Sequence, residues 1–489
     1  MNLLRRDLTA DAAAPVVEPG AEVAAAASEP GTAASEPGTA ASEPGTGAGA
    51  RATTVGARAA IGPRRRSRVP FRPAAPIPRW RLRFAASLAV LGPGIVAGFA
   101  DNDAGGITTY SLAGARYGYA LLWVLLASQI ALFFTQEMGA RLGIATGQGL
   151  TGLIRERFGV RWAAFAAGLM LIANQGSIIS EFAGIGTALG LFGVPLPVAT
   201  ILAAVAVVLL ISRGSYGKVQ YFFVAVGIGI SVAYAISAYL AQPDWSVALH
   251  SMLVPQLQSN AAYWLAVVGT VGTTITPWGQ AFIQAYVVDK RLGPEELTAE
   301  RVDVGIGTLI TNVVAAFIVV ACAATLWSNG ITNITDAGQA AEALGPLVGE
   351  AATWVFGLGL LAASLLGLGV VPLASAYTAT EAFGWEAGVD HRWGEAPAFY
   401  GILAFIIGFS AIFVLIPGLP LITVMFLAQV LNGILLPFIL VFVMLLAGDR
   451  RLMGPLANGR ILNAIGWAVT VLVASMSVIL VIASVAGSA

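Results

Sequence analysis

Charged residues are scarce in this chain, and that scarcity limits the kind of protein it can be. They make up 11% of its 489 residues, whereas apolar residues make up 57%. A soluble globular domain carries about 25% charged residues. The composition therefore predicts a chain whose surroundings are mostly lipid.

Cysteine and histidine are almost absent. Cys322 is the only cysteine, which excludes an intramolecular disulfide. The two histidines, His250 and His391, both lie in loop-like sequence, so a His/Cys metal site of the zinc-finger kind is excluded. The chain also lacks a G-x-S-x-G elbow, an H-E-x-x-H helix and a Walker loop followed by Lys. We therefore expect neither an enzyme nor a P-loop ATPase.

The first 82 residues have a composition of their own. The heptapeptide AASEPGT occurs in tandem at 26–32, 33–39 and 40–46, and large apolar residues are rare up to residue 82. Such a segment cannot bury enough apolar surface to offset its ordering entropy, so we predict a disordered tail over 1–82. Its end is rich in arginine, which either binds anionic lipid or holds this end in the cytoplasm.

Residues 83–489 are apolar segments separated by short polar breaks, which predicts a transmembrane domain. A spanning helix needs about 20 largely apolar residues. Eleven segments qualify: 85–115, 119–140, 162–190, 195–212, 220–241, 261–288, 302–327, 351–380, 398–416, 420–447 and 462–486. With a cytoplasmic N-terminus, every Lys and Arg after Arg83 except Arg116 falls at a cytoplasmic end, as the positive-inside rule requires. We therefore predict a multi-pass protein of the cell (inner) membrane with an external C-terminus.

The first of these segments carries two acids at bilayer depth. Asp101 and Asp103 stand in the middle of the segment and are followed by Gly105 and Gly106. A carboxylate in a membrane is costly and usually functional, and glycine favours departure from helical backbone. The segment reads as a helix unwound at the midplane.

The sixth segment is interrupted in a similar way. Pro277 and Gly279 lie at its centre, beside Thr276 and Gln280. Proline removes a helical hydrogen bond and clashes with the preceding turn. Segments 1 and 6 each contain a break, and each is the first segment of a group of five. This predicts two five-helix repeats of opposite orientation, at 83–245 and 255–447, with an extra helix at 460–489. Matched breaks in an inverted repeat indicate the central site of a secondary transporter.

Several stretches resemble the Nramp family of metal-ion transporters. They are DAGG at 103–106, AGARYGYALLWVLL at 113–126, ARLGIATGQGL at 140–150, AYLAQPDW at 238–245, ACAATLW at 321–327, GPLVGEAAT at 345–353 and AQVLNGILLPF at 428–438. In that family, a DPGN motif breaks helix 1 and an MPHN motif breaks helix 6. The resemblance runs from about Leu91 to Leu446 and implies the LeuT-like inverted-repeat fold, with a divalent metal ion as the transported substrate.

Departures from the family pattern bear on the choice of metal. Asp103 stands where the family has its metal-binding Asp, but Gly106 replaces the Asn, and Thr276 replaces the methionine of MPHN. A thioether favours transition metals, whereas Mg²⁺ takes oxygen ligands and keeps several waters. The pattern resembles the Nramp-related magnesium transporter branch, with Mn²⁺ as a further substrate.

The proton path expected in the family is also altered. Its acidic pair in helix 3 aligns with Ser180 and Ala183, and its histidine with Trp278. Glu181 is acidic but displaced by one residue, so its side chain is predicted to lie on another face of the helix. With Glu137, it is expected to pair with polar groups inside the bundle. We therefore predict transport without obligatory proton coupling.

Further candidates complete the predicted site. Asp101, and similarly Asn102, is either a second ligand or a structural or water-binding group. Gln429 matches a family position that approaches the ion in some states, and Gln280 is expected to act through the ion's water shell. Trp278, Pro277, Gly105 and Gly279 are expected to gate or shape the site, although apolar packing explains Trp278 equally well.

Two rival functions follow from the same sequence. One is a proton-coupled Mn²⁺ or Fe²⁺ symporter of the same fold, and the other is an amino-acid permease, whose substrate carboxylate an acid in helix 1 would repel. Beyond the ion and the lipid bilayer, we expect no cofactor, no nucleic acid and no obligate protein partner.

Overall fold

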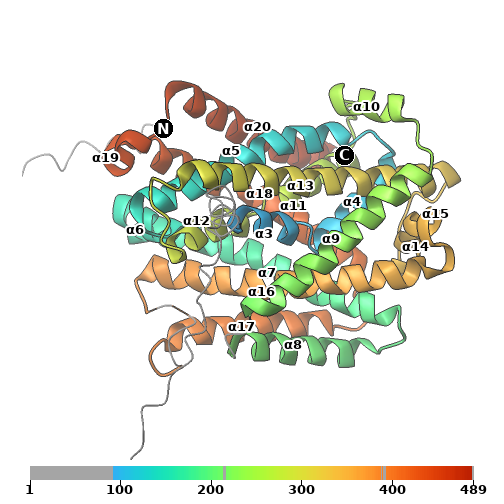
Figure 1. Cartoon of the computed structure of the whole chain (residues 1–489), viewed down its shortest axis with the longest axis horizontal. Coiled ribbons are helices and arrows are strands. Elements are labelled where there is room, and N and C mark those ends of the chain that lie inside the picture. The colour runs from blue at the N-terminus through green and yellow to red at the C-terminus, as the bar shows by residue number, and fades with distance from the viewer. Residues whose placement is uncertain (1–91, 213–215, 387, 389–392, 487–489) are drawn as a thin grey trace, which may run out of the picture. The chain divides into compact units, whose positions relative to one another are not determined.

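The structure is a computed structural model that describes residues 92–212, 216–386, 388 and 393–486; the predicted tail at 1–82 lies outside these residues. The described residues form helices joined by short connections (Figure 1). The main helices are α3 (Pro93–Ala100), α4 (Ala104–Tyr117), α5 (Leu122–Thr146), α6 (Leu150–Phe158), α7 (Val160–Gly190), α8 (Leu196–Ser212), α9 (Tyr216–Leu240), α10 (Trp245–Leu253), α11 (Ala261–Thr274), α12 (Pro277–Asp289), α13 (Leu297–Thr325), α16 (Ala352–Phe383), α17 (Pro397–Val414), α18 (Leu421–Ala447) and α20 (Arg460–Ala486). Shorter turns of helix fill the connections: α14 (Ala337–Ala341), α15 (Gly345–Val348) and α19 (Arg450–Met453).

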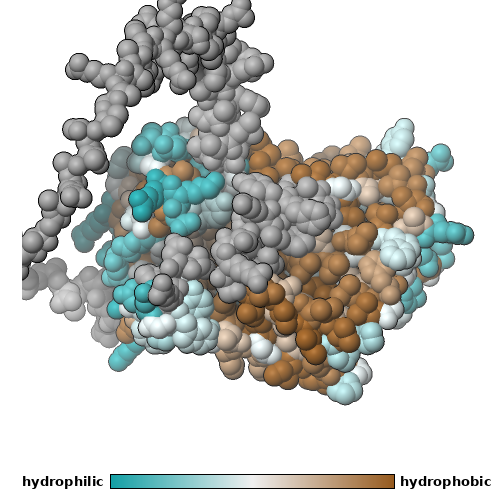
Figure 2. All heavy atoms as spheres, turned by 60° about the horizontal axis from the view of Figure 1, so that its bottom comes forward, coloured by the Kyte–Doolittle hydropathy of each residue, from teal (hydrophilic) through white to brown (hydrophobic). Residues whose placement is uncertain are grey.

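The protein is a multi-pass membrane protein. In the described ranges, 7 helical segments are long and apolar enough to cross a bilayer, and they comprise α5, α7, α13, α16, α17, α18 and α20. Large apolar side chains such as Phe405, Ile412 and Ile461 are exposed on them. Figure 2 shows apolar side chains gathered over much of one face, with hydrophilic residues towards its two ends. The count of eleven spans stays a prediction, because the first and sixth segments are each divided into two helices and the fourth and fifth contribute only the shorter apolar stretches Leu196–Leu209 and Ile228–Leu240.

The helices pack in two groups (Figure 1). One group contains α7, α8, α16 and α17; the other contains α5 and α13 with the divided helices α3/α4 and α11/α12. Helix α18 packs against both α7 and α11, and α20 packs against α11 and α18. Helices α4 and α12 also contact α7 and α16, so the divided helices lie inside the bundle, between the two groups.

Contacts between helices follow the two predicted repeats. Helix α5 packs against α13, α7 against α16 and α8 against α17, which are the matching members of each five-helix unit. In the divided helices, α3 packs against α12 and α4 against α11. The first half of one broken helix thus contacts the second half of the other, the pairing expected of two repeats with opposite orientation.

Small residues set how closely α3 approaches α13. A Cβ atom on Gly98 would lie 2.5 Å from the carbonyl oxygen of Gly307 and one on Gly94 would lie 2.7 Å from the backbone of Asp303. Small residues spaced this way let membrane helices pack backbone to backbone. The Asp303 carboxylate also accepts hydrogen bonds from the backbone N–H groups of Gly92 (3.0 Å) and Gly94 (2.5 Å), which fixes the start of α3 on α13.

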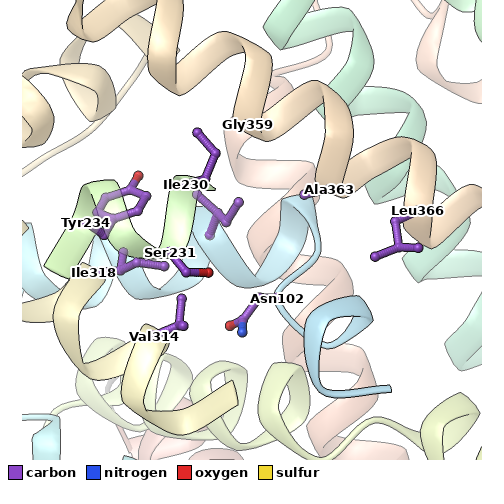
Figure 3. A pocket seen from close by; sticks show the side chains of 10 residues that line it. Asn102, Ile230, Ser231, Tyr234, Val314, Ile318, Gly359, Ala363 and Leu366 are labelled. Carbon is purple, nitrogen blue, oxygen red and sulfur yellow. The ribbon is translucent and has the colours of Figure 1, made fainter. Parts of the chain in front are cut away.

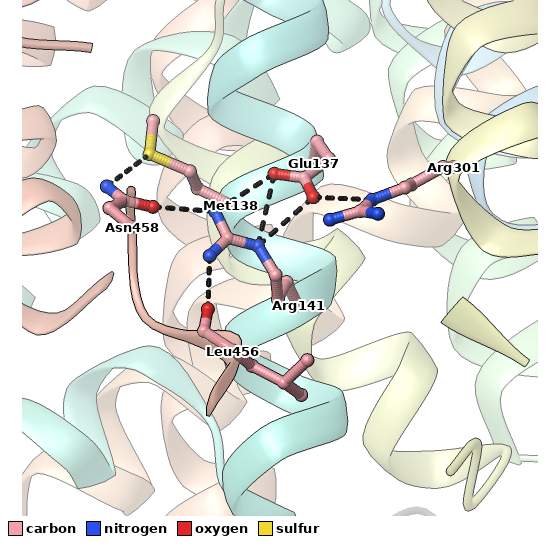
Figure 4. Close-up of polar contacts among 6 residues, drawn as sticks. All are labelled: Glu137, Met138, Arg141, Arg301, Leu456 and Asn458. Atoms are coloured by element: carbon pink, nitrogen blue, oxygen red, sulfur yellow. Dashed lines mark hydrogen bonds and ion pairs between the residues drawn. The ribbon is translucent and has the colours of Figure 1, made fainter. Parts of the chain in front are cut away.

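A buried ion network joins α5, α13 and the connection before α20 (Figure 4). The Glu137 carboxylate accepts from Arg141 at 3.1 Å and from Arg301 at 2.9 Å. Arg141 is 2% exposed and also donates to the Leu456 carbonyl and, at 2.7 Å, to Asn458 Oδ1. The prediction that Glu137 pairs inside the bundle is therefore confirmed.

Candidate functional site

The two helix breaks have the same local construction. After the break, α4 starts at Ala104 with Asp103 as its N-cap, and the Asp103 carboxylate accepts from Gly106 N at 2.6 Å. Helix α12 starts at Pro277 with Thr276 as its N-cap, and the Thr276 hydroxyl accepts from Gly279 N at 3.2 Å. Capping by an oxygen side chain stabilises a helix start, and proline is favoured at the first helical position. Two of the predicted ligands thus also hold the restarted helices in place.

Asp101 joins the two breaks to each other. Its Oδ1 accepts from the Thr276 hydroxyl at 3.3 Å, and its Oδ2 accepts from Gln136 Nε2 at 3.4 Å. Asp101 and Thr276 are both 1% exposed. Both Asp101 side-chain oxygens therefore already have donors, which gives this residue a structural part whether or not it also contacts an ion.

Oxygen atoms converge on Gly106. A Cβ atom there would lie 3.0 Å from the carbonyl oxygen of Asp101, 3.1 Å from Thr273 Oγ1 and 3.3 Å from Asp103 Oδ1. The absence of a side chain at 106 leaves this place to a carbonyl, a hydroxyl and a carboxylate. Magnesium and calcium ions take ligands of these kinds.

Helix ends add to the negative potential at the breaks. Helix α3 ends at Ala100 and α11 ends at Thr274, so the carboxyl end of each points into a break. The last carbonyls of a helix lack intrahelical donors and carry partial negative charge. Pro277 has no N–H to donate to the carbonyl four residues earlier, that of Thr273.

Two of the predicted glutamines lie buried near the breaks in different ways. Gln429 packs against Gly105, where a Cβ atom would overlap its amide nitrogen, and its Oε1 accepts from Asn432 at 2.9 Å. Gln280 is 1% exposed, and neither of its amide atoms has a hydrogen-bond partner among the described residues. Trp278 is buried with its ring 6.0 Å from that of Phe282, and its indole N–H is likewise unpartnered there.

Glu181 corrects one sequence prediction. Its carboxyl group lies against that of Asp103 rather than on a face away from it, and neither of its oxygens receives a well-aligned hydrogen bond from a donor in the described part of the chain. Adjacent residues on a helix are only about 100° apart. The Ser180 hydroxyl therefore faces Gly105, whose ideal Cβ position lies 2.8 Å from it. Glu181 faces Asp103, just before the start of α4. The expected pairing of Glu181 with a polar group inside the bundle is met by the carboxyl group of Asp103.

Asn102 faces away from this cluster. Its amide nitrogen lies 3.4 Å from the Gly98 carbonyl and 3.5 Å from the Thr311 carbonyl. It also lines a cavity of about 20 Å³ whose walls include Ile230 and Val314 (Figure 3). A space of that size holds about one water molecule, so this cavity does not extend the candidate site.

Two larger cavities lie towards opposite ends of the divided helices. One, of about 220 Å³, is lined by Arg116, Tyr117 and Phe426 among others. The second, of about 300 Å³, lies between α12 and α16 and is lined in part by Asp289 and Glu381. Asp101, Asp103 and Thr276 line neither, which matches their near-zero exposure.

The candidate site is therefore a buried set of oxygen and amide groups between two broken helices. Across the described ranges, no group of three or more His, Cys, Asp or Glu side chains could hold a metal ion. An ion bound here would take hydroxyl, amide, carbonyl and water ligands beside its carboxylates. Sequence reasoning missed Thr273 and Gln136 because a buried polar residue within an apolar helix does not show which neighbour it faces.

This architecture defines the class of protein as a helical membrane protein of the LeuT-like fold. A manganese transporter from Eremococcus coleocola superposes with a TM-score of 0.65 at 20% identity, over 81% of this chain and 87% of that one. MhsT, solved in complex with L-phenylalanine, superposes with a TM-score of 0.55 at 16% identity, over 80% of this chain and 98% of that one. At these identities the likeness establishes the fold alone.

Sequence comparison then gives the family. The model of the family described as "Natural resistance-associated macrophage protein-like" matches residues 94–483. The "Divalent metal cation transporter MntH" of Bacillus subtilis (strain 168) is 30% identical over 413 residues, covering 82% of this chain and 93% of the relative. The MntH protein of Yersinia pestis (strain Pestoides F) is 30% identical over 408 residues, covering 81% and 95%. The chain belongs to the Nramp family. The expectation that it is not an enzyme is confirmed, because its relatives are named as transporters.

Proposed function

We propose that this protein carries divalent metal cations across the membrane by alternating access, with Mg²⁺ as its main substrate and Mn²⁺ as a second. The oxygen cluster around Gly106 carries the proposal, since it joins a carboxylate, a hydroxyl and a carbonyl at a break between two helix ends. The names of the relatives, divalent metal cation transporters and a manganese transporter, support the substrate class. The protein would then stand with the Nramp-related magnesium transporters.

The proposed ligands divide into three kinds. Asp103 supplies charge, Thr276 and the Asp101 carbonyl beside Gly106 supply hard oxygens, and the side chains of Asp101, Gln280 and Gln429 act directly or through water. Pro277, Gly105 and Gly279 shape the backbone, and Trp278 closes one side. Thr276 already accepts from Gly279 N and donates to Asp101, so one lone pair of its hydroxyl remains for an ion. This hard, small donor supports Mg²⁺ over softer metals.

Transport without an obligatory proton is the second part of the proposal. Trp278 occupies the position of the family's histidine, which supports it. Helix α7 does carry an acid at the break, because Glu181 lies next to Asp103. The driving force would be the ion's own gradient and the membrane potential, which supplies about 4–5 kcal/mol per 100 mV for a divalent cation.

The remaining parts of the proposal concern topology. We propose eleven spans with helices 1 and 6 unwound, a cytoplasmic tail at 1–82, repeats at 83–245 and 255–447 and an extra helix at 460–489. The N-terminus would lie in the cytoplasm and the C-terminus outside. A proton-coupled Mn²⁺ or Fe²⁺ symporter is the alternative that the presence of Glu181 favours.

Uptake by proteoliposomes tests the function. Mg²⁺ and Mn²⁺ uptake would be followed for the wild type and for Asp103→Ala, with internal pH recorded in parallel. We expect uptake of both ions by the wild type, no uptake by Asp103→Ala and no internal acidification along a metal gradient. Normal uptake by Asp103→Ala would refute the site, and metal-dependent acidification would refute uncoupled transport.

A further inference from the structure

Two carboxyl groups face each other at the break in the first helix. Glu181 lies on α7 between Ser180, whose hydroxyl is 2.8 Å from the ideal Cβ position of Gly105, and Gly184, whose ideal Cβ position is 2.4 Å from Ala104 Cβ, and its carboxyl group contacts that of Asp103. Both residues are buried, at 0% and 1% exposure. The two carboxyl groups lie within hydrogen-bond reach of each other, and Asp103 Oδ2 and both Glu181 oxygens receive no well-aligned hydrogen bond from a donor group among the described residues.

This pair has a backbone hydrogen bond, from Gly106 N to Asp103 Oδ1, but no cationic side chain among the described residues pairs with it. Burying an ionised carboxylate is very costly unless it is paired or hydrogen-bonded. Of the carboxylates in the described chain that do form ion pairs with Arg, those of Glu137 and Asp449, neither belongs to this site. The free oxygens of Asp103 and Glu181 therefore call for a positive charge that the neighbouring side chains do not supply.

The position of the Glu181 carboxyl group is enforced by its surroundings. A Cβ atom on Gly367 of α16 would lie 2.6 Å from Glu181 Cδ and 2.7 Å from its Oε1. Any larger residue at 367 would push the carboxyl group out of its place. The packing of α16 on α7 thus leaves room for an acid here and holds it towards the broken helix.

We propose that Glu181 is a further binding residue for the transported cation, whose charge it balances together with Asp103. The proposal rests on the function proposed above, since it assigns a second anion to the same site. One carboxylate leaves a divalent ion with a net charge of +1, whereas two neutralise it inside the bilayer. The contact is made directly or through one water of the ion's shell, because Mg²⁺ usually keeps several waters. Asp101 is less suited to this part because both of its oxygens already accept hydrogen bonds.

Calorimetric titration of the purified full-length protein with Mg²⁺ and Mn²⁺ tests the proposal. Glu181→Gln keeps the shape of the side chain and removes its charge, and Asp103→Asn does the same at the first ligand. The matched control is Glu300→Gln on α13, a buried glutamate whose oxygens are also unpartnered in the described chain. We expect Glu181→Gln to raise Kd for both ions at least tenfold, Asp103→Asn to abolish binding and Glu300→Gln to stay within twofold of the wild type.

The outcomes separate this inference from the proposed function. If Asp103→Asn abolishes binding while Glu181→Gln stays within twofold, the role of Glu181 is refuted and the proposed function stands. Binding by Asp103→Asn at wild-type affinity refutes both. If Glu181→Gln does not fold, Glu181→Asp and Gly367→Ala take its place. The first shortens the acid and the second displaces it, and each is expected to weaken binding several-fold; wild-type affinity in both would overturn the inference.

Discussion

Replacing Thr276 by Met tests whether the hydroxyl at this position sets metal selectivity. The change removes the N-cap contact to Gly279 N and the hydrogen bond to Asp101 Oδ1. Loss of an N-cap costs about 1 kcal/mol and loss of a hydrogen bond to a charged group costs about 1.5–3 kcal/mol. We therefore expect a stability loss of about 2.5–4 kcal/mol, measured as a lowered unfolding temperature in detergent.

The same variant should bind soft metals better. Methionine places a thioether where the hydroxyl was, and sulfur ligands favour softer ions such as Cd²⁺. We expect the ratio of the Mg²⁺ Kd to the Cd²⁺ Kd to rise at least tenfold, a change of about 1.4 kcal/mol in relative binding free energy. Competition of each ion against Mn²⁺ on the purified protein measures this ratio.

Thr276→Val is the matched control for that experiment. It removes the hydroxyl, and with it both hydrogen bonds, but adds no sulfur. Both variants should lose similar stability, and only the methionine variant should gain Cd²⁺ preference. An equal gain in the valine variant, or an unchanged ratio in the methionine variant, would refute the reasoning about the donor atom.

Three further predictions concern the packing around the site. Arg141→Ala should destabilise the protein by about 3–5 kcal/mol because it breaks a buried ion pair. The Arg301 side chain is 47% exposed, so Arg301→Ala should cost at most about 1 kcal/mol. Thermal unfolding compares the two variants, and equal losses of stability would contradict the burial argument. Gly105→Ala places a Cβ atom on the Gln429 amide, so it should lower thermal stability, and adding Gln429→Ala should recover part of the loss; strictly additive losses in this double-mutant cycle would argue against the contact. Gly307→Ala should separate α13 from the backbone of α3, with which its Cβ would overlap, and cost about 1–3 kcal/mol of stability; an unfolding temperature equal to the wild type would show that the helices do not pack this closely.

Long apolar runs gave most of the helix positions from sequence. The predicted segments 162–190 and 420–447 correspond to α7 (Val160–Gly190) and α18 (Leu421–Ala447). Their ends are marked by charge, glycine or proline, which a sequence displays directly. Helices α6 and α10 were not predicted, because each is only 9 residues long and neither forms a run of spanning length.

The positions of the helix breaks were also readable, since their causes are local. Two acids followed by two glycines, and a proline followed by a glycine, change the backbone whatever surrounds them. In contrast, the partners of the break residues depend on how distant helices meet. Nothing near Thr276 in the sequence shows that its hydroxyl would reach Asp101, or that Gln136 would hold the other oxygen of that carboxylate.

Glu181 shows why alignment with a family pattern can mislead at a single position. The sequence argument placed it one residue away from an expected acid and therefore on an irrelevant face. Helical periodicity predicts which residues of α7 face a neighbouring helix only if that helix is straight. The neighbour here is the broken helix α3/α4, so successive residues of α7 contact different parts of it. Ser180 meets Gly105 beyond the break, and Glu181 meets Asp103 at the break itself. In a transporter with unwound helices, the residues that reach the site are therefore set by the geometry of the break as much as by helical periodicity.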